Sequence, residues 1–144
     1  MTDTGAPALP PGPVGRLASA LAADDADLDS WARTLSGAFG EVLPAGTLEV
    51  ARERKLADRV AGKPGEICMI RVRFGELVLE LAAGRAAVVG TVVREVHGIT
   101  IRRRTLTLDE WRALFAAEIT RLAAGKASLR QAIERLLGAP WPTG

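Results

Sequence analysis

The chain has 144 residues, of which 48% are hydrophobic and 25% are charged, a composition typical of one globular domain with a buried core. Aromatic residues make up only 4% and tyrosine is absent, so we expect an aliphatic core. One cysteine, Cys68, and one histidine, His97, exclude an intrachain disulfide and argue against a zinc site made by this chain alone.

Charge is distributed unevenly along the chain. Residues 1–50 carry two arginines and seven acidic residues, a net charge of −5, so with a total of +2 the remaining residues carry +7. The halves can attract each other within one chain or across a homodimer, and the basic half can attract an acidic partner. No apolar run approaches the ~20 residues of a membrane span, and residues 1–13 do not resemble a signal peptide. We therefore expect a soluble cytoplasmic protein that does not bind a membrane.

The chain is expected to begin with a tail and a helical region. Residues 1–13 are rich in proline and glycine, which predicts a disordered tail. Apolar residues then recur at helical spacing over residues 14–39, interrupted by a run of aspartates. Either Asp25 or Asp27 can cap the second part, so two short helices and one kinked helix both fit.

Residues 47–61 fit two structures. Leu48 and Val50 begin an alternating pattern that favours a strand, whereas the run from Arg52 to Ala57 contains good helix formers. We favour a strand over residues 47–55, which adds a fifth strand to the sheet described next.

The middle of the chain predicts an antiparallel meander. Apolar residues alternate with other residues over 68–74 and 77–82, and turns that contain glycine separate these segments. Residues 86–96 are rich in valine and apolar on both faces, which is typical of a central strand and leaves one face for a second copy to cover. His97 and Gly98 are expected to form a two-residue hairpin turn. The apolar face of the sheet is assigned to Cys68, Ile70, Val72, Leu77, Leu79, Leu81 and Ile101.

Two helices are expected after the sheet. Thr107 and Glu110 have the spacing of a capping box, which predicts a helix that begins near Leu108. A similar pattern from Ser128 predicts a second helix that ends before Gly138.

These patterns together predict an α+β fold. We expect an antiparallel meander of four to five strands, packed on one face by N-terminal and C-terminal helices as a two-layer sandwich. The single domain spans residues 14–138, between the tail 1–13 and an extended tail 139–144. In the second tail Trp141 lies between two prolines, where it can pack on the domain or dock into a partner.

No motif of a known catalytic or nucleotide-binding site is present, and no cofactor or metal site is expected. His97 suits a hairpin turn, and Cys68 lies on the apolar face of its strand. Asp109 and Glu110 are explained by the first turn of a helix, where carboxylates stabilise the helix terminus. We therefore assign no catalytic residue.

The arginines of the sheet are the most suggestive feature. They can form a basic face that binds an acidic protein or nucleic-acid phosphates. The alternative is a solvated face on which Glu80 and Glu95 pair with the arginines and charged edges prevent aggregation. The candidate partner-binding residues are Arg71, Arg73, Arg102, Arg104 and Trp141.

The first functional hypothesis is a non-catalytic protein-interaction domain, an accessory or adaptor module that uses the basic sheet face or the valine-rich strand. Its partner is expected to be an acidic protein, or a second copy in a homodimer. The second hypothesis is binding of the nucleic-acid backbone without sequence preference. An enzyme with an unrecognised small-molecule site is the third.

Overall fold

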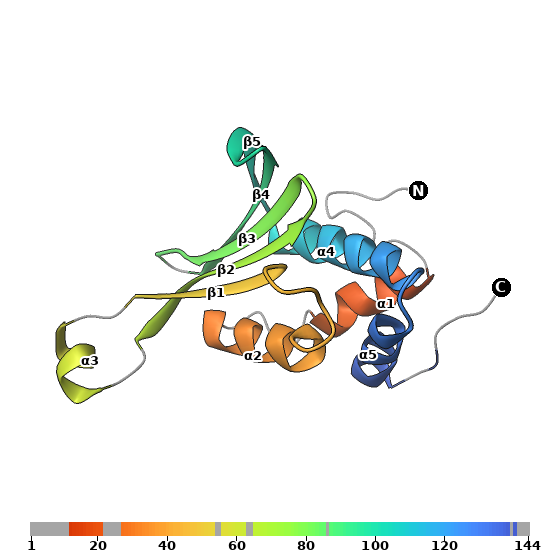
Figure 1. The fold of residues 1–144 in the computed structure, drawn as a ribbon, viewed down its shortest axis with the longest axis horizontal. Coiled ribbons are helices and arrows are strands. Elements are labelled where there is room, and N and C mark those ends of the chain that lie inside the picture. The colour runs from red at the N-terminus through yellow and green to blue at the C-terminus, as the bar shows by residue number, and fades with distance from the viewer. Residues whose placement is uncertain are drawn as a thin grey trace, which may run out of the picture.

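The structure is a computed structural model, which describes residues 12–21, 27–53, 56–62, 65–85, 87–138 and 140. These residues form a five-stranded antiparallel sheet with helices packed on one face (Figure 1). The predicted α+β fold, a meander covered by helices from both ends of the chain, is therefore confirmed. We call the face beneath the helices the helix-side face and the other face the open face.

The strands lie in the sheet in the order in which they follow one another along the chain. They are β1 (Leu48–Glu53), β2 (Glu66–Phe74), β3 (Leu77–Ala83), β4 (Val88–Val96) and β5 (Ile99–Leu106), and each is antiparallel to its neighbour. Strands β1 and β5 are therefore the two edges, and the valine-rich β4 lies next to an edge.

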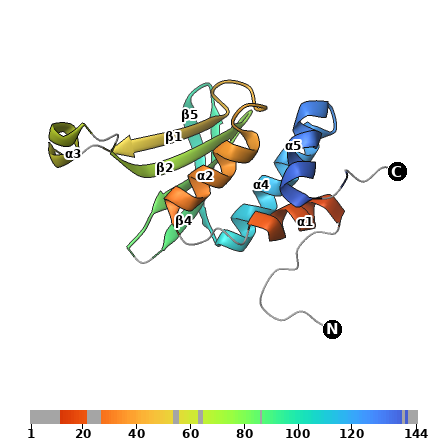
Figure 2. The ribbon, with the colours of Figure 1, turned by 90° about the horizontal axis from the view of Figure 1, so that it is seen from below.

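The ambiguous segment contains both predicted structures. Strand β1 occupies its first part, and the short helix α3 (Leu56–Ala61) follows. Helix α3 lies at the far end of β1, away from the other helices (Figure 2). The favoured strand is therefore confirmed over Leu48–Glu53, whereas the helix begins only at Leu56, so the helix formers Arg52 and Glu53 lie in the strand.

The turn between β4 and β5 confirms the predicted hairpin. His97 has a φ of 52° and Gly98 a φ of 79°. A two-residue turn with positive φ at both positions has the twist that joins two antiparallel strands. The one histidine is therefore explained by the backbone conformation of this turn.

Helices α2 (Leu28–Phe39) and α4 (Leu108–Ala123) pack on the sheet, while α1 (Gly12–Leu21) and α5 (Ala127–Leu137) pack mainly on other helices. Helix α1 begins inside the segment expected to be a tail, of which residues 1–11 lie outside the described part. The prediction that Ser128 caps the last helix is wrong, because α5 begins at Ala127 and Ser128 lies within its first turn.

The other helix boundaries follow local hydrogen bonds. The carboxylate of Asp27 accepts from the backbone N–H of Ser30 at 2.8 Å and so caps α2. At α4, the hydroxyl of Thr107 accepts from the N–H of Glu110, whose carboxylate accepts from the N–H of Thr107. These bonds satisfy N–H groups that have no partner within the helix, and the predicted start at Leu108 is confirmed.

The expectation of an aliphatic core is incomplete. The described aromatic side chains form one cluster between the helices and the sheet, where Trp111 stacks on Phe115 with ring centroids 5.5 Å apart. Trp31 meets Trp111 edge-on at 5.3 Å. Both Phe39 and Phe74 meet Phe115 edge-on. The described aromatic side chains thus lie together where helices and sheet join, within an otherwise aliphatic core.

Ile101 was expected on the apolar face beneath the helices, and this is wrong, because its side chain is 63% exposed. Ile101 and Leu106 are an odd number of residues apart, so alternation allows only one of them to face the helices. Leu106 is the one buried beneath the helices, which places Ile101, five residues earlier, on the open face.

The close approach of Trp111 to β4 makes Gly90 a test of this packing. A Cβ atom at Gly90 would lie 2.9 Å from Cδ1 of Trp111, so we expect Gly90→Ala to lower the free energy of unfolding by about 1–3 kcal/mol through overpacking. Gly37 is exposed on α2, and a Cβ atom added there would have no neighbour within 4 Å. Gly37→Ala should therefore raise the free energy of unfolding by about 0.5–1 kcal/mol. Urea unfolding of both variants checks this, and equal stability of the two would contradict the packing described.

Candidate partner-binding site

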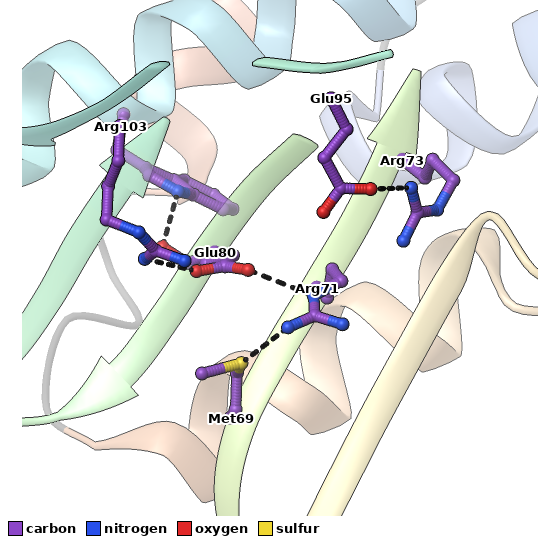
Figure 3. Close-up of polar contacts among 7 residues, drawn as sticks. Met69, Arg71, Arg73, Glu80, Glu95 and Arg103 are labelled. Carbon is purple, nitrogen blue, oxygen red and sulfur yellow. Dashed lines mark hydrogen bonds and ion pairs between the residues drawn. The ribbon is translucent and has the colours of Figure 1, made fainter. Parts of the chain in front are cut away.

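Arginines and glutamates of the open face form an ion-pair network across the sheet (Figure 3). At its centre is Glu80 on β3, which is only 3% exposed. Its carboxylate accepts from Nε of Arg71 at 3.0 Å and from Nη1 of Arg103 at 3.0 Å. Strand β2 supplies one of these arginines and β5 the other, so Glu80 links strands that are not adjacent.

A second pair extends the network. Nη1 of Arg73 donates to a carboxylate oxygen of Glu95 at 2.6 Å. This hydrogen bond lowers the pKa of Glu95 and raises that of Arg73, because it favours the charged form of both groups. The two arginines of β2 are therefore paired with Glu80 and Glu95, the pairing expected if the arginines form a solvated face with its own ion pairs.

The network also covers apolar side chains. Arg73, Val78, Val93 and Arg103 lie opposite one another in one row across four strands, and side chains in such a row share a face. Both valines are fully buried although no helix covers the open face. Long arginine stems can cover apolar surface while their charged ends remain in water. Val93 of the valine-rich strand is thus already buried within one chain, so no second copy of the chain is needed to cover it.

The helix-side face of the hairpin has a different arrangement. Arg94 on β4 lies directly opposite Arg102 on β5, and Val92 lies opposite Arg104. The row of Arg94 continues through Leu77 to Phe74 of the core, which places both arginines on the helix-side face beyond the helices. Like charges directly opposite each other destabilise a sheet. Three arginines therefore concentrate positive charge on one side of this hairpin.

Nearby carboxylates compensate the positive charge of these three arginines only weakly. Arg94 lies 3.3 Å from Glu76, but both side chains are more than half exposed, and exposed pairs contribute little. The hydrogen bond from the backbone N–H of Thr107 chiefly lowers the pKa of Glu110, and the charge of Arg104 lowers it further. Among the described residues no ion pair involves Arg102.

The structure thus divides the predicted site residues. Arg71 and Arg73 belong to the paired network of the open face, while Arg102 and Arg104 lie on the other face, so the four do not form one basic face. Trp141 lies outside the described residues. Arg94 was missed because strand pairing, and not spacing along the chain, brings it beside Arg102. We call Arg94, Arg102 and Arg104 the arginine hairpin.

The groups considered for catalysis have local partners. Sγ of Cys68 lies 3.5 Å from the carbonyl oxygen of Ala51, on a half-buried strand. Asp109 pairs with Arg112, and Glu110 completes the capping box. No group of three or more potential metal ligands occurs within the described ranges. A hollow of about 520 Å³ beside α4 and α5 is lined by apolar and cationic residues and by none of these groups.

No match to this chain is found among protein-family models, curated proteins or solved structures. None of the described helices is both long enough and apolar enough to cross a membrane.

The open-face network can be tested by removing one charge. Glu80→Gln keeps the shape of the side chain but removes the carboxylate to which Arg71 and Arg103 donate. Because both arginines are partly exposed, we expect the free energy of unfolding to fall by about 1–2 kcal/mol. Glu76→Gln is the matched control, since its pair is exposed and should contribute about 0.5 kcal/mol or less. Urea unfolding measures both, and equal losses would show that burial of Glu80 adds nothing.

Stability should also depend on pH in a defined direction. Hydrogen bonds from backbone N–H groups of Ser30 and Thr107 lower the pKa of Asp27 and Glu110, as Arg73 does for Glu95. Carboxyls with a lower pKa in the folded state stabilise it at neutral pH, and this contribution is lost as the pH falls below ~4 through their folded pKa values. Asp27→Asn combined with Glu110→Gln keeps cap-forming side chains without the charge. Its urea midpoint should therefore decline less between pH 7 and pH 3 than that of the wild type, and parallel declines would assign the acid sensitivity to other carboxyls.

Proposed function

We propose that this chain is a non-catalytic protein-interaction domain, an accessory or adaptor module, that binds an acidic partner through the arginine hairpin. The observation that carries the proposal is the direct opposition of Arg94 and Arg102, with Arg104 beside them, on an exposed part of the sheet. A carboxylate-rich partner would remove the repulsion and gain charge-assisted hydrogen bonds.

The contrast within the same sheet supports this surface. Arg71, Arg73 and Arg103 are matched to Glu80 and Glu95 by short hydrogen bonds. Opposite Arg102, by contrast, the sheet carries another arginine, Arg94, and no glutamate. Each of these open-face arginines thus has a hydrogen-bonded carboxylate, whereas Arg94 has only an exposed pair and Arg102 has no ion pair among the described residues.

Protein is favoured over nucleic acid as the source of that anion. Binding of single-stranded nucleic acid commonly uses aromatic side chains on which bases stack, and the described aromatic residues are all in the core. The hairpin instead exposes Ile99 by 66% and Ile101 by 63%. Apolar side chains beside arginines suit a protein surface. Binding of the nucleic-acid backbone is the alternative outcome of the experiment.

Charge reversal on the hairpin tests the proposal. The double variant Arg102→Glu/Arg104→Glu should lose a defined acidic protein that the wild type captures from nuclease-treated native lysate, with capture reduced at least about tenfold. Arg16→Glu/Arg135→Glu changes the net charge equally, at exposed helix positions, and should retain the partner. Quantitative mass spectrometry of the captured proteins provides the measurement.

Three results would count against the proposed function. Equal capture by the wild type and the hairpin variant would remove the hairpin as the binding surface. Capture that disappears on nuclease treatment would support nucleic acid as the ligand. Equal loss in both double variants would show that net charge, and no particular surface, controls binding.

A further inference from the structure

We infer that the partner contributes an extended acidic segment that adds to the sheet as a sixth strand beside β5, with carboxylates at alternate positions. This inference rests on the proposed function, and it specifies the conformation and the charge pattern of the ligand.

The outer edge of β5 is available for strand addition. In the described sheet β5 pairs with β4 on one side only, and every residue from Ile99 to Thr105 is exposed. The unpaired N–H and C=O groups of such an edge are a template for an added strand. From Arg102 to Leu106 the pairing with β4 is regular, because the register shift lies nearer the turn. An incoming strand would thus meet a regular edge beside the arginines.

Strand geometry determines where the charges of the ligand must lie. Side chains alternate between faces along a strand, so Arg102 and Arg104 share the helix-side face while Arg103 points to the open face. Arg103 is already bound to Glu80. A neighbouring strand therefore meets unsatisfied positive charge at two positions on one face, and its best complement is a pair of carboxylates two residues apart. The residue between them faces the other way and needs no charge.

A second copy of this chain fits the edge poorly. Antiparallel pairing of two β5 strands over their length would place arginines opposite arginines, which is unfavourable. The charges could also serve only to keep edges apart. That explanation accounts for Arg102 and Arg104, but not for Arg94, which lies on an interior strand opposite Arg102. An acidic strand accounts for all three.

Peptides of equal composition test the inference. The first probe is a fluorescent eight-residue peptide of alternating Glu and Thr, which in an extended conformation has all its carboxylates on one face. The second repeats Glu-Glu-Thr-Thr, so it has the same charge but divides it between the faces. The third probe is the alternating peptide with the backbone nitrogen of every Thr methylated, which removes the N–H donors of one edge and keeps all the carboxylates. The fourth is methylated at every Glu instead, which removes the N–H donors of the other edge.

Fluorescence anisotropy at constant low salt should show the alternating peptide binding about tenfold more tightly than the second peptide, as expected for two added cross-strand ion pairs. One of the two N-methylated forms should lose binding by at least a similar factor. The variant Arg102→Glu/Arg104→Glu should lose the preference, and Arg16→Glu/Arg135→Glu should keep it.

The outcomes separate the inference from the proposed function. If all four peptides bind the wild type alike but bind the hairpin variant more weakly, acidic recognition by the hairpin stands and strand addition is wrong. If neither double variant affects any peptide, and the lysate experiment likewise detects no role for the hairpin, the proposed function fails as well. A preference for alternation that survives charge reversal would place strand addition at another edge and overturn the inference.

Discussion

Trp111 holds the helical layer on the centre of the sheet, and the rest of the structure depends on this contact. Its indole N–H donates to the backbone carbonyl of Glu80 at 3.0 Å, and its ring lies so close to β4 that a Cβ atom at position 90 would be only 2.9 Å from Cδ1. The same ring stacks on Phe115 and meets Trp31. Buried indole N–H groups usually find an acceptor, and for Trp111 the acceptor lies on the middle strand. One side chain thereby links α4, α2 and the sheet.

The contact of Trp111 with β3 also connects the two faces of the sheet. The backbone of Glu80 accepts from Trp111, while its side chain accepts from Arg71 and Arg103 on the open face. A nearly buried carboxylate requires positive partners. Because Arg103 supplies one of them, alternation along β5 sends Arg102 and Arg104 to the opposite face. Their orientation is therefore a consequence of how the centre of the sheet is stabilised, and it accounts for the unmatched charge at the hairpin.

Local sequence signals predicted the local structure well. The capping box at Thr107, the His97-Gly98 turn and the alternation of β2 each depend on neighbours within a few residues, so they could be recognised without the fold. The site depends on register, and a change of one residue in register alters every opposing pair. Nothing in the chain order indicated that Arg94 lies opposite Arg102. The exposure of Ile101 was equally hard to predict, because Ile101 and Leu106 lie on opposite faces of β5 and the sequence alone does not say which of them the helices cover.

The two groups of arginines differ in how much of the fold depends on them. Those of the open face hold a buried glutamate and cover buried valines, so replacing them disturbs packing as well as charge. Arg102 and Arg104 lie on an exposed edge strand, where substitutions away from packed groups usually change stability by only about 0.5 kcal/mol. Such positions can match the charge pattern of a partner at little cost to the fold.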